Sequence, residues 1–341
     1  MISQVESSVR AEAVTSRRKA PVFVLGCGRS GTTLLYHMLL SAGGFAVYRA
    51  ESNAINLLEP RFGDLSKPRN KERLLEAWYD SRLYTLSGLN KEQVKSLVMA
   101  ECRNGGDFLR IIMGAIAREQ GMDRWADCTP EHLLYLGRIK QTIPDALIVH
   151  IIRDGRDVAL SMEKGNWIRP ITRQAKQGLA VAGLYWEWIV SKGRRDGRKL
   201  GGDYTEVRFE ELVADPPRVL KELGKFIDHD LDYTRIRKNG IGSVSEPNTS
   251  FKNETKDGAF NPVARWKEKF SPVQLRKFEG LVGRTLEEFG YPLATKDRSL
   301  LESSELKSMR ATYRAYFNSK LWLKAKTPLA KLMVTKDLSW V

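Results

Sequence analysis

Short apolar runs that end in turn residues mark the buried strands of this chain. Residues 21–26 read Pro-Val-Phe-Val-Leu-Gly, and residues 146–152 form a second apolar run before another glycine-containing turn. Continuous apolar runs of this length are typical of parallel strands that are buried on both faces. A further strand is predicted over residues 204–209. Strands followed at once by a turn and a helix indicate an α/β protein whose site lies at the carboxyl ends of parallel strands.

Helical periodicity occupies most of the remaining chain. A helix with one apolar face is predicted directly after the first turn, over residues 31–42. Residues 60–120 are charged and helical in pattern, and we expect them to form an insert over the site that helps to choose the acceptor. We therefore divide the chain into a flexible arm at 1–20, a catalytic domain at 21–295 that includes this insert, and a basic, aromatic helical extension at 296–341.

The charge balance narrows the partners without selecting one. Lys and Arg number 56 against 41 Asp and Glu, a formal net charge of +15, which attracts nucleotides, acidic acceptors, nucleic acid or anionic lipid. Three cysteines without CxxC spacing argue against a disulfide framework and a zinc site. The first residues lack the apolar core of a signal peptide, and no later run approaches a membrane span. We expect a cytoplasmic protein, at most peripheral at a membrane surface.

The first turn has the composition of a phosphate-binding loop. It reads Gly-Cys-Gly-Arg-Ser-Gly-Thr-Thr from Gly26, close to the NTPase pattern GxxxxGK[ST], but Thr32 stands where that pattern requires lysine. Glycines let backbone N–H groups converge on an anion at a helix N-terminus. The loop is therefore expected to hold a phosphate without a triphosphate or a metal. The residues expected to bind it are Gly28, Arg29, Ser30, Gly31, Thr32 and Thr33.

The second turn offers a separate anion site. Arg153 follows the strand at 146–152 directly, and Ser161 lies eight positions later on the next predicted helix. Both side chains can converge on one anion. By itself the string also fits a helix-capping turn with a surface arginine, but its pairing with the first loop favours a nucleotide with two separated phosphate groups.

Both strings resemble motifs of the sulfotransferase family. GCGRSGTTLL resembles the 5′-phosphosulfate loop of the branch that reads RSGTT and includes the protein-tyrosine sulfotransferases, and the second string is similar to the family's 3′-phosphate motif. The resemblance implies a three-layer α/β/α, P-loop NTPase-like fold. It implies in-line transfer of a sulfuryl group from 3′-phosphoadenosine-5′-phosphosulfate to an acceptor hydroxyl. It also implies that Arg29 neutralises the leaving phosphate oxygen, while Arg153 and Ser161 bind the 3′-phosphate.

Three weaker similarities suggest further site residues. Glu51 stands where the tyrosine-sulfating branch carries its Glu-Thr pair, which implies the general base. Ser250 matches a serine of that branch that would stabilise the sulfuryl oxygens, and Arg265 lies in a segment that resembles the one closing over the nucleotide. One position departs from the pattern, because Cys128 stands where related enzymes often have a lysine. The positive charge that this lysine supplies must therefore come from another residue.

Several alternatives stay open at this point. A phosphoryl-transfer enzyme of the P-loop class shares the strand, loop and helix but needs the missing lysine and a magnesium carboxylate. A non-catalytic module that binds nucleic acid would explain the charge but not two phosphate loops, so no nucleic-acid partner is expected. The acceptor is a sugar, a lipid, a small alcohol or a peptidyl tyrosine. The helical extension either packs on the parent domain or a second subunit, or docks on an anionic membrane surface.

Overall fold

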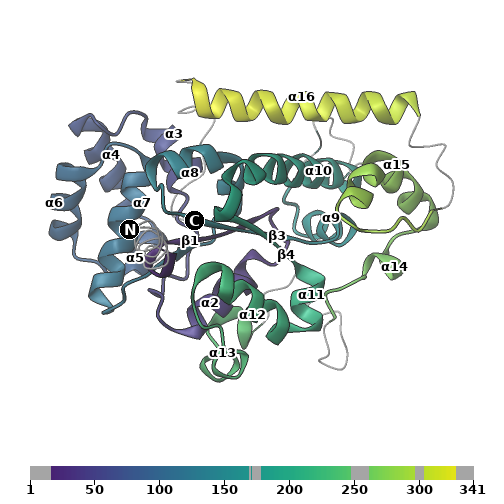
Figure 1. Ribbon diagram of the computed structural model, residues 1–341. Coiled ribbons are helices and arrows are strands. Elements are labelled where there is room, and N and C mark those ends of the chain that lie inside the picture. Colours follow the sequence, from purple (N-terminus) through teal and green to yellow (C-terminus); the bar gives the residue numbers. More distant parts are fainter. Residues whose placement is uncertain (1–16, 169, 171–177, 247–260, 296–302, 328–341) are drawn as a thin grey trace, which may run out of the picture.

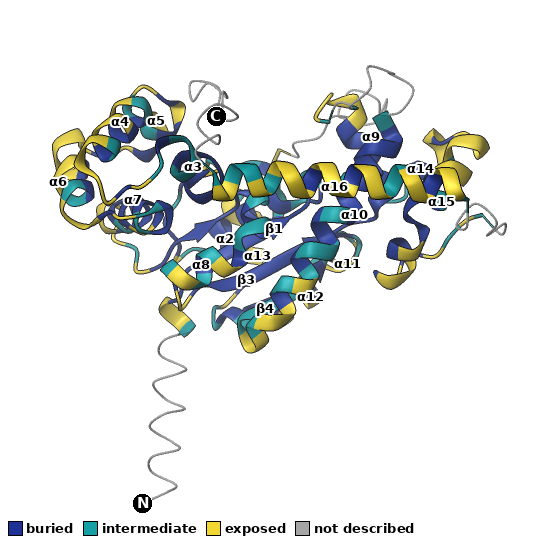
Figure 2. Ribbon diagram, turned by 90° about the horizontal axis from the view of Figure 1, so that it is seen from above, coloured by how far each residue is buried: buried dark blue, intermediate teal, exposed yellow. Residues whose placement is uncertain are grey.

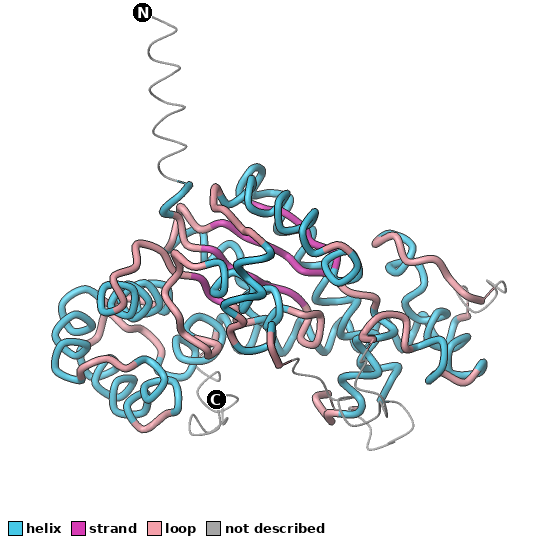
Figure 3. The backbone as a smooth tube through the Cα atoms, turned by 90° about the horizontal axis from the view of Figure 1, so that it is seen from below, coloured by secondary structure: helices cyan, strands magenta, loops and turns pink. Residues whose placement is uncertain are grey.

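A parallel sheet forms the centre of the computed structural model, which describes residues 17–168, 170, 178–246, 261–295 and 303–327. Within these residues four strands pair in the order β2-β1-β3-β4, and every pairing is parallel (Figures 1 and 3). All four carboxyl ends therefore lie at one edge of the sheet. The strands are β1 (Val22–Gly26), β2 (Ala126–Asp127), β3 (Leu147–Ile152) and β4 (Tyr204–Arg208).

Helices cover both faces of this sheet, so the predicted three-layer fold is confirmed (Figure 1). Side chains alternate along β1, with Phe23 and Leu25 packed into one apolar core and Val22 and Val24 into the other. One layer contains α2 (Thr32–Ala42), α11 (Phe209–Ala214), α12 (Pro216–Ile227) and α13 (Tyr233–Asn239). The other contains α8 (Leu136–Thr142), α9 (Gly155–Lys164), α10 (Gly178–Gly197) and α15 (Pro272–Glu288).

Short helices fill the range of the predicted insert and gather at one end of the sheet (Figure 1). A single π-helical turn at Ala54–Leu58 leads into them. Their core includes Trp78, whose ring meets that of Phe108 edge to face at 5.6 Å between centroids. The helices are α3 (Glu59–Phe62), α4 (Pro68–Tyr79), α5 (Arg82–Ser87), α6 (Lys91–Glu101) and α7 (Gly105–Glu119).

The last described helix, α16 (Ser304–Lys326), runs along α10 and exposes its outer face (Figure 2). Its buried side chains include Phe317, whose ring lies 5.5 Å from that of Tyr185 and 5.3 Å from that of Trp188. Arg310 adds an ion pair with Glu187 of α10. The basic aromatic helix therefore packs on its own domain. No helix in the described part of the chain is long and apolar enough to cross a membrane.

Candidate functional site

The first phosphate loop leaves β1 at Gly26 and enters α2 through backbone conformations that few residues adopt. Arg29 has a φ of 70° and Gly31 a φ of 94°. A Cβ atom on Gly31 would lie 2.4 Å from the ring of Phe209, which follows β4, so only glycine fits there. Gly31 is the N-cap residue of α2, and it has no side chain that could cap the helix. Its first N–H groups thus lie at an uncapped helix N-terminus, which suits an anion.

The hydroxyl groups of this loop differ in their surroundings. Ser30 is fully buried, and within the described residues its Oγ has no hydrogen-bond partner. A buried hydroxyl without a partner is uncommon, and a bound phosphate would satisfy it. Thr32, at the position of the NTPase lysine, is buried as well, whereas Thr33 lines an open cavity. The loop therefore offers hydroxyl donors where a nucleoside triphosphatase would offer an amine.

The two phosphate motifs meet. Arg29 donates a hydrogen bond from Nε to Ser161 Oγ at 2.9 Å, and Arg153 donates from one guanidinium nitrogen to the carbonyl oxygen of Arg29 at 2.8 Å. Burial, followed by the charge of Arg153, lowers the pKa of Arg29. Arg29 is half-buried and Arg153 is buried, and their like charges repel each other, so an anion between them would be stabilised. The site thus favours a group with at least one full negative charge.

Arg153 also has structural contacts that its sequence position did not reveal. Its second terminal nitrogen donates to the carbonyl of Pro262 at 2.6 Å, and its guanidinium lies 4.7 Å from the ring centroid of Phe209. Within the described residues its Nε is buried and has no hydrogen-bond partner. Arg153 therefore links three segments and retains an unsatisfied donor.

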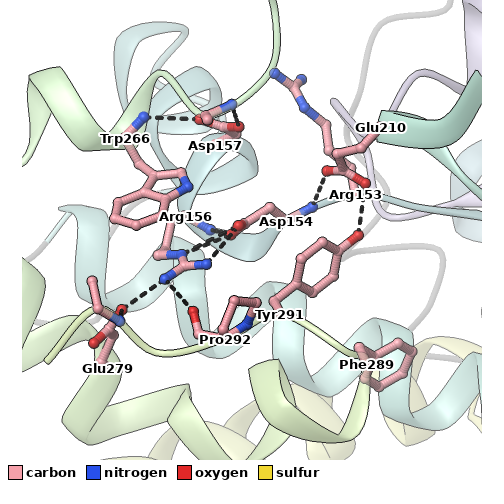
Figure 4. A network of polar contacts seen from close by, with 12 residues as sticks. Arg153, Asp154, Arg156, Asp157, Glu210, Trp266, Glu279, Phe289, Tyr291 and Pro292 are labelled. Carbon is pink, nitrogen blue, oxygen red and sulfur yellow. Dashed lines mark hydrogen bonds and ion pairs between the residues drawn. The ribbon is translucent and has the colours of Figure 1, made fainter. Parts of the chain in front are cut away.

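A polar network behind the second motif keeps it rigid (Figure 4). The backbone N–H of Asp154 donates to Glu210 at 2.8 Å, and the hydroxyl of Tyr291 donates to the other oxygen of Glu210 at 2.9 Å. Arg156 forms ion pairs with Asp154 and Glu279, both at 2.7 Å, and all three side chains are buried. Both ion pairs of Arg156 are therefore structural. Arg153 is the arginine of this turn that contacts the first phosphate loop.

Asp157 fastens the late basic segment to this motif. Its carboxylate accepts the backbone N–H of Ala264 at 2.8 Å and that of Trp266 at 3.0 Å, one residue on either side of Arg265. Ala264 has a φ of 59°, a conformation that this pair of hydrogen bonds holds in place. Arg265 directly precedes α14 (Trp266–Lys269). Burial is the main cause that raises the pKa of Asp157 to about 6.

Glu51 follows the first βα unit on a segment that is tied to the end of β2. The adjacent Ser52 donates to Asp127 at 2.5 Å, and the backbone N–H of Asn53 donates to Thr129 Oγ1 at 3.2 Å. The side-chain amide of Asn53 donates in turn to the carbonyl of Glu51 at 3.1 Å. The Glu51 side chain itself is exposed. Its backbone is therefore fixed while its carboxylate reaches the solvent.

His132 completes the anchor. Its Nδ1 lies 2.9 Å from Asp127, and its Nε2 lies 3.3 Å from the backbone nitrogen of Ile55, so the ring joins the end of β2 to the π-helical turn at Ala54–Leu58. Burial raises the pKa of Asp127, but the contact with His132 and the hydrogen bonds from Ser52 and the Thr129 backbone outweigh it and lower that pKa. Asp127 is thus an ionised structural acceptor rather than a second acid or base.

Two cavities share Glu51 as part of their walls. One has a volume of about 730 Å³ and is also lined by Thr33, Arg49 and Cys128. The other has a volume of about 440 Å³ and is also lined by Gly28, by Tyr185 of α10 and by Lys320 and Lys324 of α16. Burial, then Asp127 and Glu51, raise the pKa of the Cys128 thiol. The thiol is therefore neutral, and it supplies no positive charge where related enzymes often have lysine.

The structure brings most of the residues expected from the sequence to one edge of the sheet. Glu51 and Gly28 line one cavity, the loop follows β1, Arg153 and Ser161 contact Arg29, and Arg265 lies beside Asp157's two partners. Ser250 lies outside the described residues. Within those residues no group of His, Cys, Asp or Glu is arranged to hold a metal ion.

Three side chains at this edge were not expected. Phe209 lies against both Gly31 and the Arg153 guanidinium, Asp157 holds the Arg265 segment, and Trp167 lies 5.4 Å from the Arg29 guanidinium. The sequence held one signal for Asp157, which is the second acid of the Arg-Asp-Gly-Arg-Asp string. A carboxylate beside a phosphate-binding motif repels the phosphate, so its presence there indicates a structural role. The positions of Phe209 and Trp167 depend on the tertiary fold and had no such signal.

Comparison with known proteins agrees with this geometry. The model of the "Sulfotransferase family" matches residues 21–233. The sulfotransferase domain of the Synechococcus PCC 7002 olefin synthase is similar in fold, with 19% identity, a TM-score of 0.55, and coverage of 80% of this chain and 95% of that domain. The sulfotransferase domain from the curacin biosynthetic pathway has 14% identity, a TM-score of 0.53, and coverage of 80% and 98%.

A curated relative supplies sequence similarity but no activity. An uncharacterised protein of Aquifex aeolicus (strain VF5) is 25% identical over 240 residues, which cover 64% of this chain. The chain spans only 28% of that relative's length. Since the family model covers well over half of the chain, including both phosphate motifs, the protein belongs to the sulfotransferase family.

Proposed function

We propose that this protein transfers a sulfuryl group from 3′-phosphoadenosine-5′-phosphosulfate to an acceptor hydroxyl. The observation that carries the proposal is the 2.9 Å hydrogen bond between Arg29 and Ser161, which joins the two phosphate motifs at one edge of the sheet. A donor with phosphates at both the 5′ and 3′ positions of one ribose has its charges at a short, fixed separation. Two adjoining anion sites suit this donor better than they suit a linear triphosphate.

Each motif has a separate task in this proposal. Gly28, Ser30, Gly31, Thr32 and Thr33 would bind the 5′-phosphosulfate, and the unpartnered Ser30 Oγ supports this assignment. Arg153 and Ser161 would bind the 3′-phosphate, and Arg265 would close over the nucleotide. Arg29 contacts Ser161 in the structure and would serve both groups, because its guanidinium lies where the motifs meet. No step requires a metal ion.

The chemistry needs one base and one site for developing negative charge. Glu51 would take the proton of the acceptor hydroxyl while the acceptor oxygen forms a bond to sulfur. The bond between sulfur and the bridging phosphate oxygen breaks in the same step, and Arg29, with Ser250, would stabilise the charge left on the oxygens. Adenosine 3′,5′-bisphosphate is the second product. The position of Glu51 in the walls of two cavities supports this role, since a base must reach the acceptor beside the donor.

The cavity of about 440 Å³ is the proposed acceptor site. Besides Glu51 it is lined by Trp167, Ile168 and Tyr185, an organic surface that suits a sugar, a lipid, a small alcohol or a tyrosine side chain. The exposed Tyr316 and Trp322 of α16 would supply a contact with a membrane surface or a second subunit that presents the acceptor.

Calorimetric titration tests the donor assignment. Adenosine 3′,5′-bisphosphate should bind at least about tenfold more tightly than AMP, because only the former engages Arg153 and Ser161. ATP with magnesium should bind no better than AMP. Equal affinities for the bisphosphate and AMP would remove the 3′-phosphate site, and tighter binding of magnesium ATP would instead favour phosphoryl transfer.

A further inference from the structure

The last turns of α16 reach the proposed acceptor cavity from outside the family-matched part of the chain. The family model ends at residue 233, whereas Lys320 and Lys324 of α16 line the cavity that Glu51 also lines. Residues four positions apart share one face of a helix, so both lysines belong to the same side. Any acceptor that enters this cavity meets two cations that lie outside the segment matched by the family model.

The position of these lysines is set by packing further up the helix. Phe317 is buried against α10, and the side chain of Asn318 accepts a hydrogen bond from Trp188 Nε1 at 2.9 Å. Lys324 then pairs with Glu131 at 3.2 Å, with its side chain only 18% exposed. The helix is therefore anchored on both sides of Lys320. Lys324 is therefore a fixed part of the cavity wall, and the exposed Lys320 lies one turn before it on the same face of the helix.

Two lysines, Lys320 and Lys324, and two glutamates, Glu51 and Glu131, line the acceptor cavity. Lys324 is matched by Glu131, whereas Lys320 forms no ion pair with any carboxylate in the described part of the chain. Lys324 also lines a neighbouring groove of about 1270 Å³ under α16. Seven cationic side chains and three acidic ones line that groove. The cations are Lys67, Arg103, Arg138, Lys192, Lys199, Lys324 and Lys326, and the acids are Glu59, Asp64 and Asp196.

We propose that Lys320 and Lys324 select an acceptor that carries an anionic group next to the hydroxyl to be sulfated. Within the proposed function, the hydroxyl would lie at Glu51 while a phosphate, sulfate or carboxylate of the same molecule lies against the lysine pair. The first phosphate loop meets this cavity at Gly28, whereas the lysines reach it from α16, so once nucleotide fills the donor site this charge preference concerns the acceptor alone. A neutral alcohol leaves the charge of Lys320 uncompensated and is the poorer acceptor.

Binding of matched alcohols to protein saturated with adenosine 3′,5′-bisphosphate tests the proposal without requiring turnover. The first pair of probes is 1,6-hexanediol and 6-hydroxyhexyl phosphate. The second pair is 4-hydroxybenzyl alcohol and 4-hydroxybenzyl phosphate, in which the benzylic hydroxyl carries the phosphate. In each pair the phosphate should bind at least about tenfold more tightly at low salt, and the difference should shrink in 0.5 M salt. Lys320→Gln with Lys324→Gln should reduce the ratio to about threefold or less.

The control variant is Lys307→Gln, which removes one positive charge from the exposed first turn of α16 and should leave the ratio unchanged. If neither phosphate binds more tightly than its neutral partner, or if the double variant keeps the wild-type ratio, the proposal is wrong. Failure of the nucleotide itself to bind would overturn the donor assignment. Loss of the phosphate preference in Lys320→Gln with Lys324→Gln, measured without nucleotide, would then still test the two lysines, because the phosphate loops are the same in both proteins.

Discussion

Asp157 accepts a hydrogen bond from the backbone N–H of Trp266 at 3.0 Å, and this contact fastens the second phosphate motif to a segment 109 residues later in the chain. The same carboxylate accepts the N–H of Ala264, so it fixes both neighbours of Arg265. A buried acid with two main-chain donors holds a loop more firmly than packing of exposed side chains would. The position of Arg265 is therefore coupled to the ionisation of one carboxyl group.

This coupling predicts a pH dependence of stability. Burial raises the pKa of Asp157 to about 6, whereas in the unfolded chain an aspartate titrates near 3.9. A raised folded-state pKa means that the native state binds the proton more tightly, so this group favours folding at low pH. Its contribution should be lost as the pH rises from about 4 through 6, by roughly 3 kcal/mol. Asp157→Asn should flatten the urea-unfolding free energy across this interval, and an unchanged slope would contradict the assignment.

The two arginines at the phosphate motifs should differ in kinetic effect. Arg153→Ala should weaken binding of adenosine 3′,5′-bisphosphate at least about tenfold. The substitution removes a charged hydrogen-bond donor to the 3′-phosphate and the hydrogen bond to the Arg29 carbonyl. Arg29→Ala should lower kcat at saturating donor by about 10²–10³, as expected for a group that stabilises developing charge. Arg103→Ala, an exposed arginine of the insert, is the control and should change neither value. Unchanged turnover in Arg29→Ala would exclude its catalytic role.

Ser52 should act on the reaction through Glu51. Ser52→Ala removes the hydrogen bond to Asp127, which loosens the segment that carries Glu51 and leaves Asp127 with one donor fewer. We expect kcat to fall roughly tenfold with little change in donor affinity, whereas Glu51→Gln should abolish the rise of the rate with pH that a general base produces. Ser52→Thr, which keeps the hydroxyl, should recover most of the activity. If Ser52→Ala retained full kcat, the anchor would have no bearing on the base.

The parts of this molecule that local sequence determines were predictable. β1, β3 and β4 are apolar or β-branched runs beside turn residues, and each lies where its run predicted it. β2 was missed because two residues, Ala126 and Asp127, are too short to show any periodicity. Its pairing with β1 is set by the sheet and not by its own composition.

The site divides in the same way. The first loop and the Arg153 to Ser161 turn were found because their chemistry requires fixed spacing within one segment. The contacts from Asp157 to Trp266 and from Phe209 to Gly31 join residues that are far apart in the chain, so no local pattern indicated them. Arg29 was expected to face the leaving group, and its hydrogen bond to Ser161 depends on a loop conformation with a positive φ that the sequence does not specify.

The buried and exposed faces of α16 provide the last prediction. Phe317 is buried between Tyr185 and Trp188, whereas Tyr316, its neighbour in sequence, is 41% exposed on the outer face. Phe317→Ala should lower the free energy of unfolding by about 3 kcal/mol, because it leaves a cavity against α10. Tyr316→Ala should cost less than about 0.5 kcal/mol. Denaturant titration of the two variants measures the difference.

Sedimentation with anionic vesicles then separates packing from membrane contact. If the outer face of α16 docks on a membrane, Tyr316→Ala together with Trp322→Ala should reduce sedimentation while leaving stability unchanged. If α16 only packs on α10, the wild type should not sediment at all, and Phe317→Ala should alter stability alone. Equal stability of Phe317→Ala and the wild type would mean that α16 is not seated on α10 in solution. The lysine pair would then lose its fixed position beside Glu51, and with it the structural basis for selecting an anionic acceptor.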